Sequence, residues 1–493
     1  MDSPSVNLVA SSSNPNGSLP PKHDTGHSRD SFFKSVQWSA DGTTLFTSSF
    51  SNRICTFVLP GNLLEPRQSP VELTAHSTLA LAEPTSAIAP CPYFALERPS
   101  TQVLLTASTD HPIHLRHAFP PSPNNDDDDD DTPSPSPLSP VRAQPRPLAS
   151  FHLIKQETEA YLPIASLIWP APGTHFIAGT TNRIALFDLS RPDTLNPAPL
   201  LSIPTIPSTR HLAKGGGVGM RGTVSALAAQ PYQPPQPPPP QSAVADGNAG
   251  TGGGAGLGLL AAGTWTRHLG LYDLLRSGEC VATWSVGGAA REARVGGRGV
   301  LQMVWSPCGR YLVVNERGST GLLVYDLRGT HRRLLGALEG RDGTTNQRLS
   351  CDVFPGSRAA GGFEVWAGTK DGGVVVWEGV GNRDGGVEPS WDWKAHGSAV
   401  GAAAMHMSGS VVATCSGAWK FVDEDEESPG SSDKSGSESE SESESESESE
   451  SESDSGTSTA PRSSSKSQIV VEETSLKIWS LGPGKPPQDD TET

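Results

Sequence analysis

The chain has 493 residues, a formal net charge of −17, and large numbers of glycine (52) and proline (44) residues. Most of the excess acid lies in Asp126–Asp131 and in residues 421–468, so the rest of the chain is close to neutral and the total charge excludes no class of partner. The amino-terminal residues have neither the basic start nor the apolar core of a secretory signal, and no apolar run approaches the ~18 residues that cross a membrane. We expect a soluble, intracellular protein without a membrane partner, whose six widely spaced cysteines stay reduced and mostly buried.

Two short patterns alternate along the chain and indicate strands. The first is an apolar residue, then tryptophan or another apolar residue, then a turn; it occurs at 36–42, 167–173, 303–309, 351–357 and, more weakly, 403–409. The second is an apolar run that ends in an aromatic residue, often followed by aspartate. It occurs seven times, as "RICTFVL", "PIHLRHAF", "RIALFDL", "HLGLYDL", "GLLVYDL", "GVVVWEG" and "SLKIWSL". Turn residues separate these runs, as expected between strands.

Each repeat contains two further strands. Residues 311–327, "YLVVNERGSTGLLVYDL", read as a strand, a tight polar turn and a second strand, and "RRLLGAL" follows as a more variable fourth. Four short strands in each of seven units, without a helical period, predict an all-β fold, a seven-bladed β-propeller of the WD-repeat type. We name the strands of each blade a to d from the inside outwards. Because nothing strand-like follows residue 481, part of residues 3–12 is expected to supply the last outer strand and close the ring.

Three insertions interrupt the repeats. They lie between strands c and d of the second blade, a and b of the fourth, and b and c of the seventh, at residues 120–146, 231–256 and 421–468. Each is acidic or rich in proline and glycine and too poor in apolar residues to pack, so we expect disorder. The domain organisation is then an amino-terminal segment, one monomeric propeller and a disordered tail, at residues 1–30, 31–480 and 481–493.

The loops of a propeller open on two rims, and the b–c turns share one rim with the d–a loops. We call this the basic rim, because it receives fourteen of the thirty-seven basic residues. Acids accompany these cations, and "DLRGTHRR" lies on the opposite rim, so charge alone favours the basic rim only slightly as an anion-binding surface. The cations are Arg53, Arg183, Arg267, Arg317 and Lys370 in the b–c turns and Arg210, Lys214, Arg221, Arg291, Arg294, Arg298, Arg341, Arg348 and Lys394 in the d–a loops.

The d–a loop before the sixth blade, "RDGTTNQRLS" (341–350), contains glutamine and arginine side chains that a turn does not require. Its amide and guanidinium groups suit the base edges and phosphates of single-stranded RNA, and aromatic residues in a neighbouring turn offer rings on which bases stack. The alternative is structural, because threonine and asparagine tighten turns and the arginine can pair with a neighbouring acid; the residues alone leave both open. The candidate RNA-binding residues are Thr345, Asn346, Gln347, Arg348, Arg53, Arg183, Trp265, Arg267, His268, Arg317 and Lys370.

Two other polar sets have mainly structural interpretations. His111 and His114 flank the b–c turn of the second blade, and a structural role is favoured for both over contact with RNA. An asparagine or aspartate precedes strand c in four blades, and this repetition indicates turn chemistry at Asn52, Asp110, Asn182 and Asp371.

Some blocks of the sequence are more specific than the general repeat. They are "SVQWSADGTTLFTSSFSNRI", "HPIHLRHAF", "TTNRIALFDLSRP", "RHLGLYDL" and "TTNQR", together with an acidic interruption after "ATCSGAWKF". In these blocks the chain resembles, over residues 32–480 apart from the insertions, the WD-repeat telomerase Cajal body protein family, with which the yeast Swt-type splicing-associated proteins are often grouped. The resemblance implies a nuclear scaffold that binds the terminal-loop sequence of box H/ACA small Cajal body RNAs and telomerase RNA, works with ribonucleoprotein proteins, and directs these RNAs to a Cajal body or a similar nuclear compartment.

No enzyme activity and no cofactor or metal is expected. The sequence contains no paired Cys/His ligand set, no "GxSxG" motif and no complete phosphate loop. The alternative to an RNA-binding scaffold is a protein-interaction propeller, in a pre-mRNA splicing complex or as an adaptor, that binds an acidic peptide on the basic rim.

The Ser-Glu repeat of the third insertion suits acidophilic kinases. The candidate phosphorylation sites are Ser437, Ser439, Ser441 and Ser453. One hypothesis is that this insertion, once phosphorylated, competes with RNA for the basic rim. The alternative is that it is only a solvated spacer.

Overall fold

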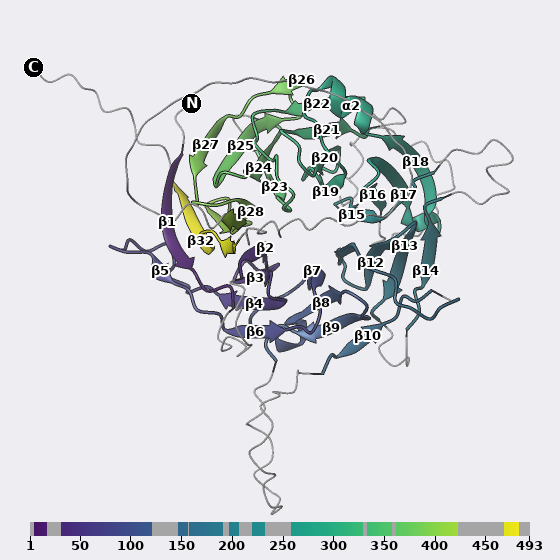
Figure 1. Cartoon of the computed structure of the whole chain (residues 1–493), viewed down its shortest axis with the longest axis horizontal. Coiled ribbons are helices and arrows are strands. Elements are labelled where there is room, and N and C mark those ends of the chain that lie inside the picture. The colour runs from purple at the N-terminus through teal and green to yellow at the C-terminus, as the bar shows by residue number, and fades with distance from the viewer. Residues whose placement is uncertain are drawn as a thin grey trace, which may run out of the picture.

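The structure is a computed structural model, and it describes residues 4–16, 31–120, 146–155, 157–190, 197–206, 219–231, 258–328, 333–356, 361–422 and 468–482. In this part of the chain seven sheets, each built on four antiparallel strands, stand in a ring (Figure 1). The predicted all-β, seven-bladed β-propeller is confirmed.

Six blades follow one another along the chain, and the seventh joins its two ends. Two short strands, β5 (Val71–Glu72) and β26 (Gly385–Val387), add parallel edges to blades seven and five. From strand a to strand d the blades contain β2 (Phe33–Trp38), β3 (Thr44–Ser49), β4 (Arg53–Val58) and β6 (Ser77–Ala80); β7 (Thr85–Pro90), β8 (Val103–Ser108), β9 (Ile113–His117) and β10 (Ala149–Phe151); β11 (Ser166–Ile168), β12 (His175–Thr180), β13 (Arg183–Asp188) and β14 (Leu201–Pro204); β15 (Val224–Ala229), β16 (Leu259–Thr264), β17 (His268–Asp273) and β18 (Glu279–Ser285); β19 (Val300–Trp305), β20 (Tyr311–Glu316), β21 (Leu322–Asp326) and β22 (Arg333–Leu338); β23 (Cys351–Pro355), β24 (Phe363–Gly368), β25 (Gly373–Val380) and β27 (Trp391–Lys394); and β28 (Val400–Met405), β29 (Val411–Ser416), β32 (Ser475–Gly482) and β1 (Ser5–Ser12).

The amino-terminal strand β1 is the outer strand of blade seven. It pairs antiparallel with β32, from Ser5 opposite Gly482 to Ser12 opposite Leu476, and Ala10 is fully buried. Figure 1 shows β1 beside β32 on the outside of the ring. The ring is thus closed by backbone hydrogen bonds between the two ends of the chain, and the expectation that part of residues 3–12 closes it is confirmed.

Two tryptophans of the first sequence pattern join neighbouring blades. Trp38 in β2 donates its indole N–H to the carbonyl of Ala404 in β28, at 2.9 Å, and Trp305 in β19 donates to Ala228 in β15, at 3.0 Å. Each bond connects the inner strand of one blade to the inner strand of the blade before it. The third, Trp169, donates instead to the carbonyl of Gly173 in its own turn, at 2.8 Å, so at all three positions the one donor of the indole is satisfied.

Blade seven holds a buried polar network. The ring of His396, in the d–a loop, shares hydrogen bonds with Ser475 Oγ at 2.8 Å and Thr414 Oγ1 at 2.7 Å. Trp479 donates its indole N–H to the same Thr414 oxygen at 2.8 Å. The network ties strands b and c of the closing blade to the loop that enters it.

The turn prediction is confirmed, because all four residues lie in the turns between strands b and c. Asn52, Asp110 and Asn182 also have a left-handed backbone, with φ of 60°, 56° and 56°. In blade six the left-handed residue is Gly372, directly after Asp371, with φ of 87°.

The irregular segments hold two features that the sequence did not predict. A short helix, α2 (Gly287–Glu292), lies in the d–a loop after blade four, and short 3₁₀ turns lie at Pro99–Thr101 and Leu274–Arg276. The third insertion does not begin at 421 or end at 468, because β30 (Trp419–Val422) and β31 (Gln468–Val471) pair as an antiparallel hairpin. Residues 121–145, 232–257 and 423–467 of the insertions, and residues 483–493 of the tail, lie outside the described residues.

The state of the cysteines agrees with the expectation of reduced, mostly buried thiols. All six thiols are free, and four of them are buried. None of the described helices has the length and apolar character needed to cross a bilayer.

Candidate nucleic-acid interface

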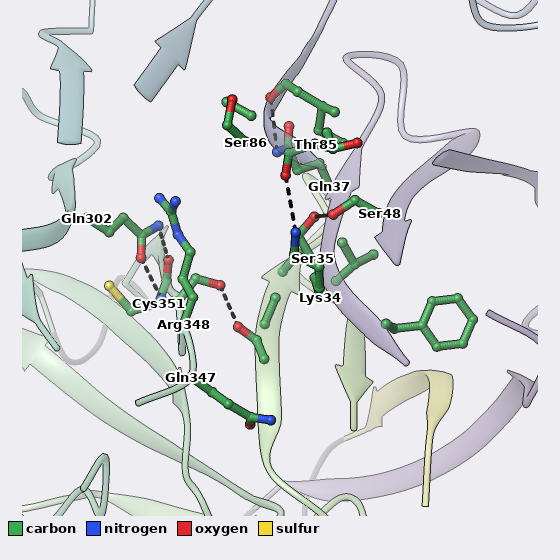
Figure 2. A pocket seen from close by; sticks show the side chains of 18 of the residues that line it. Lys34, Ser35, Gln37, Ser48, Thr85, Ser86, Gln302, Gln347, Arg348 and Cys351 are labelled. Atoms are coloured by element: carbon green, nitrogen blue, oxygen red, sulfur yellow. Dashed lines mark hydrogen bonds between the residues drawn. The ribbon is translucent and has the colours of Figure 1, made fainter. Parts of the chain in front are cut away.

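A cavity of about 810 Å³ opens in the centre of the ring. Inner strands of all seven blades line it, together with the d–a loop before blade six. Lys34 and Arg348 are its cations, and Figure 2 shows them reaching into the cavity from different sides. Asp352 is the acid among the described lining residues; its carboxylate accepts hydrogen bonds from the backbone N–H groups of Val353 and Met405, both at 2.8 Å, and burial raises its pKa to about 6.

Arg341 anchors the d–a loop that carries the candidate residues. Its side chain is only 2% exposed. The guanidinium donates to the carbonyls of Gly368 (2.9 Å) and Leu349 (3.0 Å) and to Asn315 Oδ1 (2.8 Å), and burial lowers its pKa to about 10. This arginine is therefore a buried structural group, although its loop position had suggested a rim cation.

The first half of the loop is a set of tight turns. Asp342 Oδ1 accepts hydrogen bonds from the backbone N–H and the hydroxyl of Thr344, at 3.1 and 2.6 Å, and Thr345 Oγ1 accepts one from the backbone N–H of Gln347 at 3.2 Å. Lys370 reaches across from blade six and forms an ion pair of 3.0 Å with Asp342. These contacts agree with the structural interpretation for the threonines, and the charge of Lys370 is paired.

The second half of the loop lines the cavity. Asn346 and Arg348 are exposed, and Gln347 is half-buried. Gln347 donates its amide N–H to the carbonyl of Gly417 at 3.2 Å. Arg348 donates to the carbonyl of Leu301 at 3.1 Å, so its hydrogen bond goes to a backbone group, whereas the structural alternative had expected an acid.

The cations of the cavity influence each other. The pKa of Lys34 is lowered by burial and by the charge of Arg348. Arg348 keeps contact with solvent, but its guanidinium lies within the ring of blades, and this desolvation together with the charge of Arg317 lowers its pKa. Lys34 and Arg348 thus line the same cavity, and Arg317 lies close enough for its charge to act on Arg348. A bound phosphate would reduce this mutual repulsion, so the arrangement favours an anion.

Lys34 carries a charge that its structural contact does not require. It occupies a bulge between Phe33 and Ser35, and its ammonium donates to the carbonyl of Thr85 in the next blade at 3.1 Å. Ser225 occupies the equivalent bulge in β15 and makes the equivalent contact, to the carbonyl of Val300 at 2.5 Å. A hydroxyl is thus enough to join two blades here, and the lysine adds a positive charge to the cavity.

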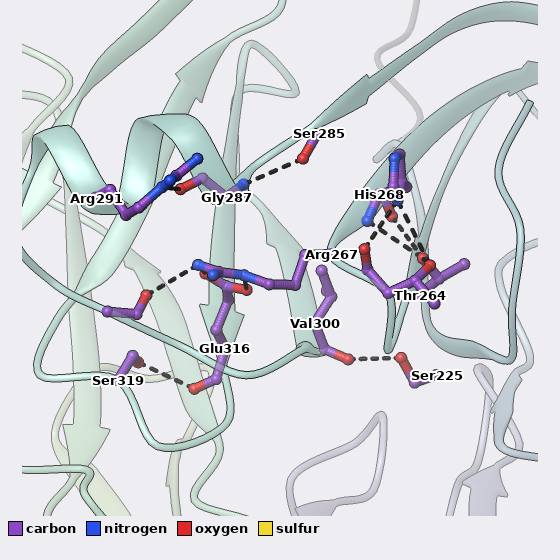
Figure 3. Close-up of polar contacts among 12 residues, drawn as sticks. Ser225, Thr264, Arg267, His268, Ser285, Gly287, Arg291, Val300, Glu316 and Ser319 are labelled. Carbon is purple, nitrogen blue, oxygen red and sulfur yellow. Dashed lines mark hydrogen bonds and ion pairs between the residues drawn. The ribbon is translucent and has the colours of Figure 1, made fainter. Parts of the chain in front are cut away.

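Two predicted rim cations are engaged inside the fold. Arg53 is buried and donates to the carbonyl of Asn16, at 2.9 Å, which fastens the segment after β1. Arg267 has a left-handed backbone, with φ of 63°, and forms two hydrogen bonds of 2.7 and 2.8 Å with the buried carboxylate of Glu316 (Figure 3). It also donates to the carbonyl of Gly296 at 3.2 Å, so the b–c turn of blade four is joined to the d–a loop before blade five and to the end of β20.

The remaining candidates lie on the rim outside the cavity lining. Arg183 is exposed, Trp265 is 56% exposed, and His268 has its Nδ1 2.8 Å from the carbonyl oxygen of Thr266. Arg210, Lys214 and all four candidate phosphorylation sites, Ser437, Ser439, Ser441 and Ser453, lie outside the described residues.

The two histidines of blade two have local partners. His111 Nδ1 lies 2.8 Å from the carbonyl oxygen of Thr109, and His114 Nδ1 lies 2.9 Å from Ser150 Oγ. Burial lowers the pKa of His114 to about 4. These contacts agree with the structural interpretation.

Sequence reasoning missed Lys34 and a group of rings at the cavity mouth. Phe32, Phe50 and Trp419, which we call the aromatic cluster, all line the cavity, with ring centroids 5.1 to 5.4 Å apart. Each is an aromatic residue in an otherwise polar loop or at its edge, and that was the available signal. Lys34 gave no such signal, because it lies in a strand.

Comparison with known proteins extends the resemblance found in the motifs. The chain is 24% identical over 402 residues to telomerase Cajal body protein 1 of Bos taurus, covering 80% of this chain and 60% of that protein. It is 23% identical over 356 residues to guanine nucleotide-binding protein negative regulator 1 of Schizosaccharomyces pombe, covering 72% of this chain and 71% of that protein. No protein-family model matches the chain. The fold, the motifs and these similarities agree, and they confirm that the chain is a WD-repeat propeller that resembles the telomerase Cajal body protein family.

Proposed function

We propose that the protein is a non-catalytic scaffold of a nuclear ribonucleoprotein, and that the end of the central cavity on the basic rim binds a single-stranded loop of RNA. The observation that carries the proposal is the pair Lys34 and Arg348. Neither forms an ion pair with any described residue, and both line one cavity beside the amides of Asn346 and Gln347. Single-stranded RNA is recognised by this combination, because cations hold phosphates and amides read base edges.

The name of the bovine relative supports the choice of RNA. That protein is named for telomerase and for the Cajal body, which points to a nuclear complex of RNA and protein. Box H/ACA small Cajal body RNAs and telomerase RNA are therefore the RNA ligands that we propose, with localisation in the nucleus and with ribonucleoprotein proteins as partners.

The test removes each charge while keeping the structural contact. Lys34→Ser reproduces the hydroxyl of Ser225, and Arg348→Gln keeps a donor for the Leu301 carbonyl. Each variant should weaken binding of a box H/ACA terminal-loop RNA about tenfold and lower the slope of log affinity against log salt by about 0.7. Arg310→Gln, an exposed cation in the a–b turn on the opposite rim, is the control and should leave both values unchanged.

Thermal unfolding of each variant distinguishes binding from folding. Wild-type melting temperature with reduced affinity supports the proposal. Unchanged affinity in both Lys34→Ser and Arg348→Gln would refute the location of the site, and absence of RNA binding by the wild-type protein would refute the function.

The fission-yeast relative favours a second candidate. Its name refers to the negative regulation of a guanine nucleotide-binding protein, which is a function exerted on another protein. The corresponding proposal is a protein-interaction propeller, in a pre-mRNA splicing complex or as an adaptor. Affinity purification with and without ribonuclease separates the two, because a protein-binding propeller keeps its partners after the RNA is digested.

A further inference from the structure

The aromatic cluster stands at the mouth of the cavity, where blade one meets blade seven. Phe32 and Phe50 are stacked, with centroids 5.3 Å apart and an interplanar angle of 21°. Trp419 packs edge-on against both, at 5.4 and 5.1 Å. Phe32 precedes β2, Phe50 lies in the turn after β3, and Trp419 begins β30, so the loops on both sides of the junction contribute.

Packing accounts for two of the three rings. A side chain at Gly417 would lie 2.2 Å from Phe32 Cβ, so Phe32 rests directly on the backbone of blade seven. Phe32 is buried and Trp419 is partly buried between the loops. Phe50 is different, because it is 49% exposed although it is stacked on Phe32. Packing therefore leaves about half of the Phe50 side chain open to solvent.

The groups around Phe50 match the other parts of a nucleotide. Gln347 donates one amide N–H to the carbonyl of Gly417, beside the cluster, and an amide retains a second donor and an acceptor. Lys34 follows Phe32 by two residues, and Arg348 follows Gln347 directly. All of them line the same cavity as the rings. A flat apolar surface, an amide and two cations thus line one cavity.

We propose that the aromatic cluster is a stacking site for one unpaired nucleobase of the bound RNA. The base lies on Phe50 and extends the stack that Phe32 begins, Gln347 reads the edge of the base, and the flanking phosphates lie near Lys34 and Arg348. This inference rests on the proposed RNA-binding function and adds a specific recognition site to it. The cation pair favours RNA over an apolar peptide as the occupant, because an apolar side chain on Phe50 would leave both cations without a negative charge to balance them.

The test combines a change in the protein with a change in the RNA. Phe50→Leu keeps an apolar side chain but removes the flat ring, and it should weaken binding of the box H/ACA terminal-loop RNA about tenfold. Because no charge is removed, the salt dependence of binding should stay at the wild-type slope. Phe50→Tyr retains the ring and should restore the affinity. Tyr93→Leu is the matched control, since Tyr93 is also 49% exposed but lies in the a–b loop of blade two, on the opposite rim.

Abasic substitution of each loop nucleotide in turn identifies the stacked base. At one position the loss of the base should cost the wild-type protein about tenfold in affinity and cost the Phe50→Leu variant almost nothing, because the two changes remove the same contact. Wild-type affinity in Phe50→Leu, or equal losses for both proteins at every abasic position, would refute the stacking site while leaving RNA binding intact. No binding of this RNA by the wild-type protein would refute the proposed function itself.

Discussion

The buried histidine of the closing blade should make the stability of the propeller depend on pH. His396 is buried between Ser475 and Thr414. Burial, and then the charge of Lys477, lower its pKa to about 3, while Glu473 acts in the opposite direction. In the unfolded chain the same ring has a pKa of about 6.5. The folded state therefore keeps the ring neutral at pH values where the unfolded state binds a proton.

The direction and size of the effect follow from these two pKa values. Stability from this group is fully present above about pH 6.5 and is lost as the pH falls from 6.5 towards 3, because protons then bind the unfolded state in preference. Between pH 7 and pH 5 the loss for His396 is about 2 kcal/mol. That is a large part of the stability of an ordinary domain.

Urea unfolding at pH 7 and pH 5 measures this loss, with His396→Gln as the comparison. The glutamine side chain does not titrate, so the variant should be less stable at pH 7 but should lose about 2 kcal/mol less than the wild type between the two pH values. Other titrating groups, such as His114 with its pKa of about 4, contribute equally to both proteins and cancel. An identical pH dependence in the two proteins would show that His396 is not held neutral in the fold.

Two further predictions concern the parts that hold the ring and the loop. Deletion of residues 1–12 removes the antiparallel partner of β32 and should lower the free energy of unfolding by at least about 4 kcal/mol. A synthetic peptide of residues 4–13 should restore the melting temperature. A truncated protein that melts like the wild type would contradict the closure of the ring by β1. Arg341→Met leaves the acceptors at Gly368, Asn315 and Leu349 without their donor, so the free energy of unfolding measured in urea should fall by about 3 kcal/mol. Arg341→Lys should restore only part of this loss. Unchanged stability would mean that this arginine does not anchor the loop.

The blades could be predicted because their signals are local. A tryptophan or other apolar residue before a turn marks strand a, and an aromatic residue before aspartate marks strand c, so each blade is recognised within about forty residues. The closing strand β1 could also be predicted, because the seven c strands in the sequence imply seven outer strands and nothing after the last c strand could supply the seventh. The short helix α2 and the hairpin of β30 and β31 had no such signal, because six helical residues or four strand residues make too little of a period to recognise.

The candidate site was predictable only as a surface. Sorting cations by loop gives the rim on which each one begins, but the direction of a side chain depends on neighbours that are distant in sequence. Arg53, Arg267 and Arg341 all belong to rim loops, and all three turn inwards because Asn16, Glu316 and Asn315 offer acceptors there. An arginine side chain carries donors and no acceptor, so the position of a buried carbonyl or carboxylate determines which way it points.

The seam of the ring is where closure and the proposed binding site meet. Blade seven is completed by hydrogen bonds between the two ends of the chain, whereas the other six blades are each continuous in sequence. The aromatic cluster spans this seam, because Phe32 and Phe50 come from the blade-one side and Trp419 from blade seven. A base stacked on Phe50 would rest on a cluster that both sides build, so its binding free energy would add to the stability of the closed ring. The same ligand placed in a groove between two other blades would join strands that the chain already holds together. A ligand at the seam therefore stabilises ring closure, which a ligand between two other blades would not do.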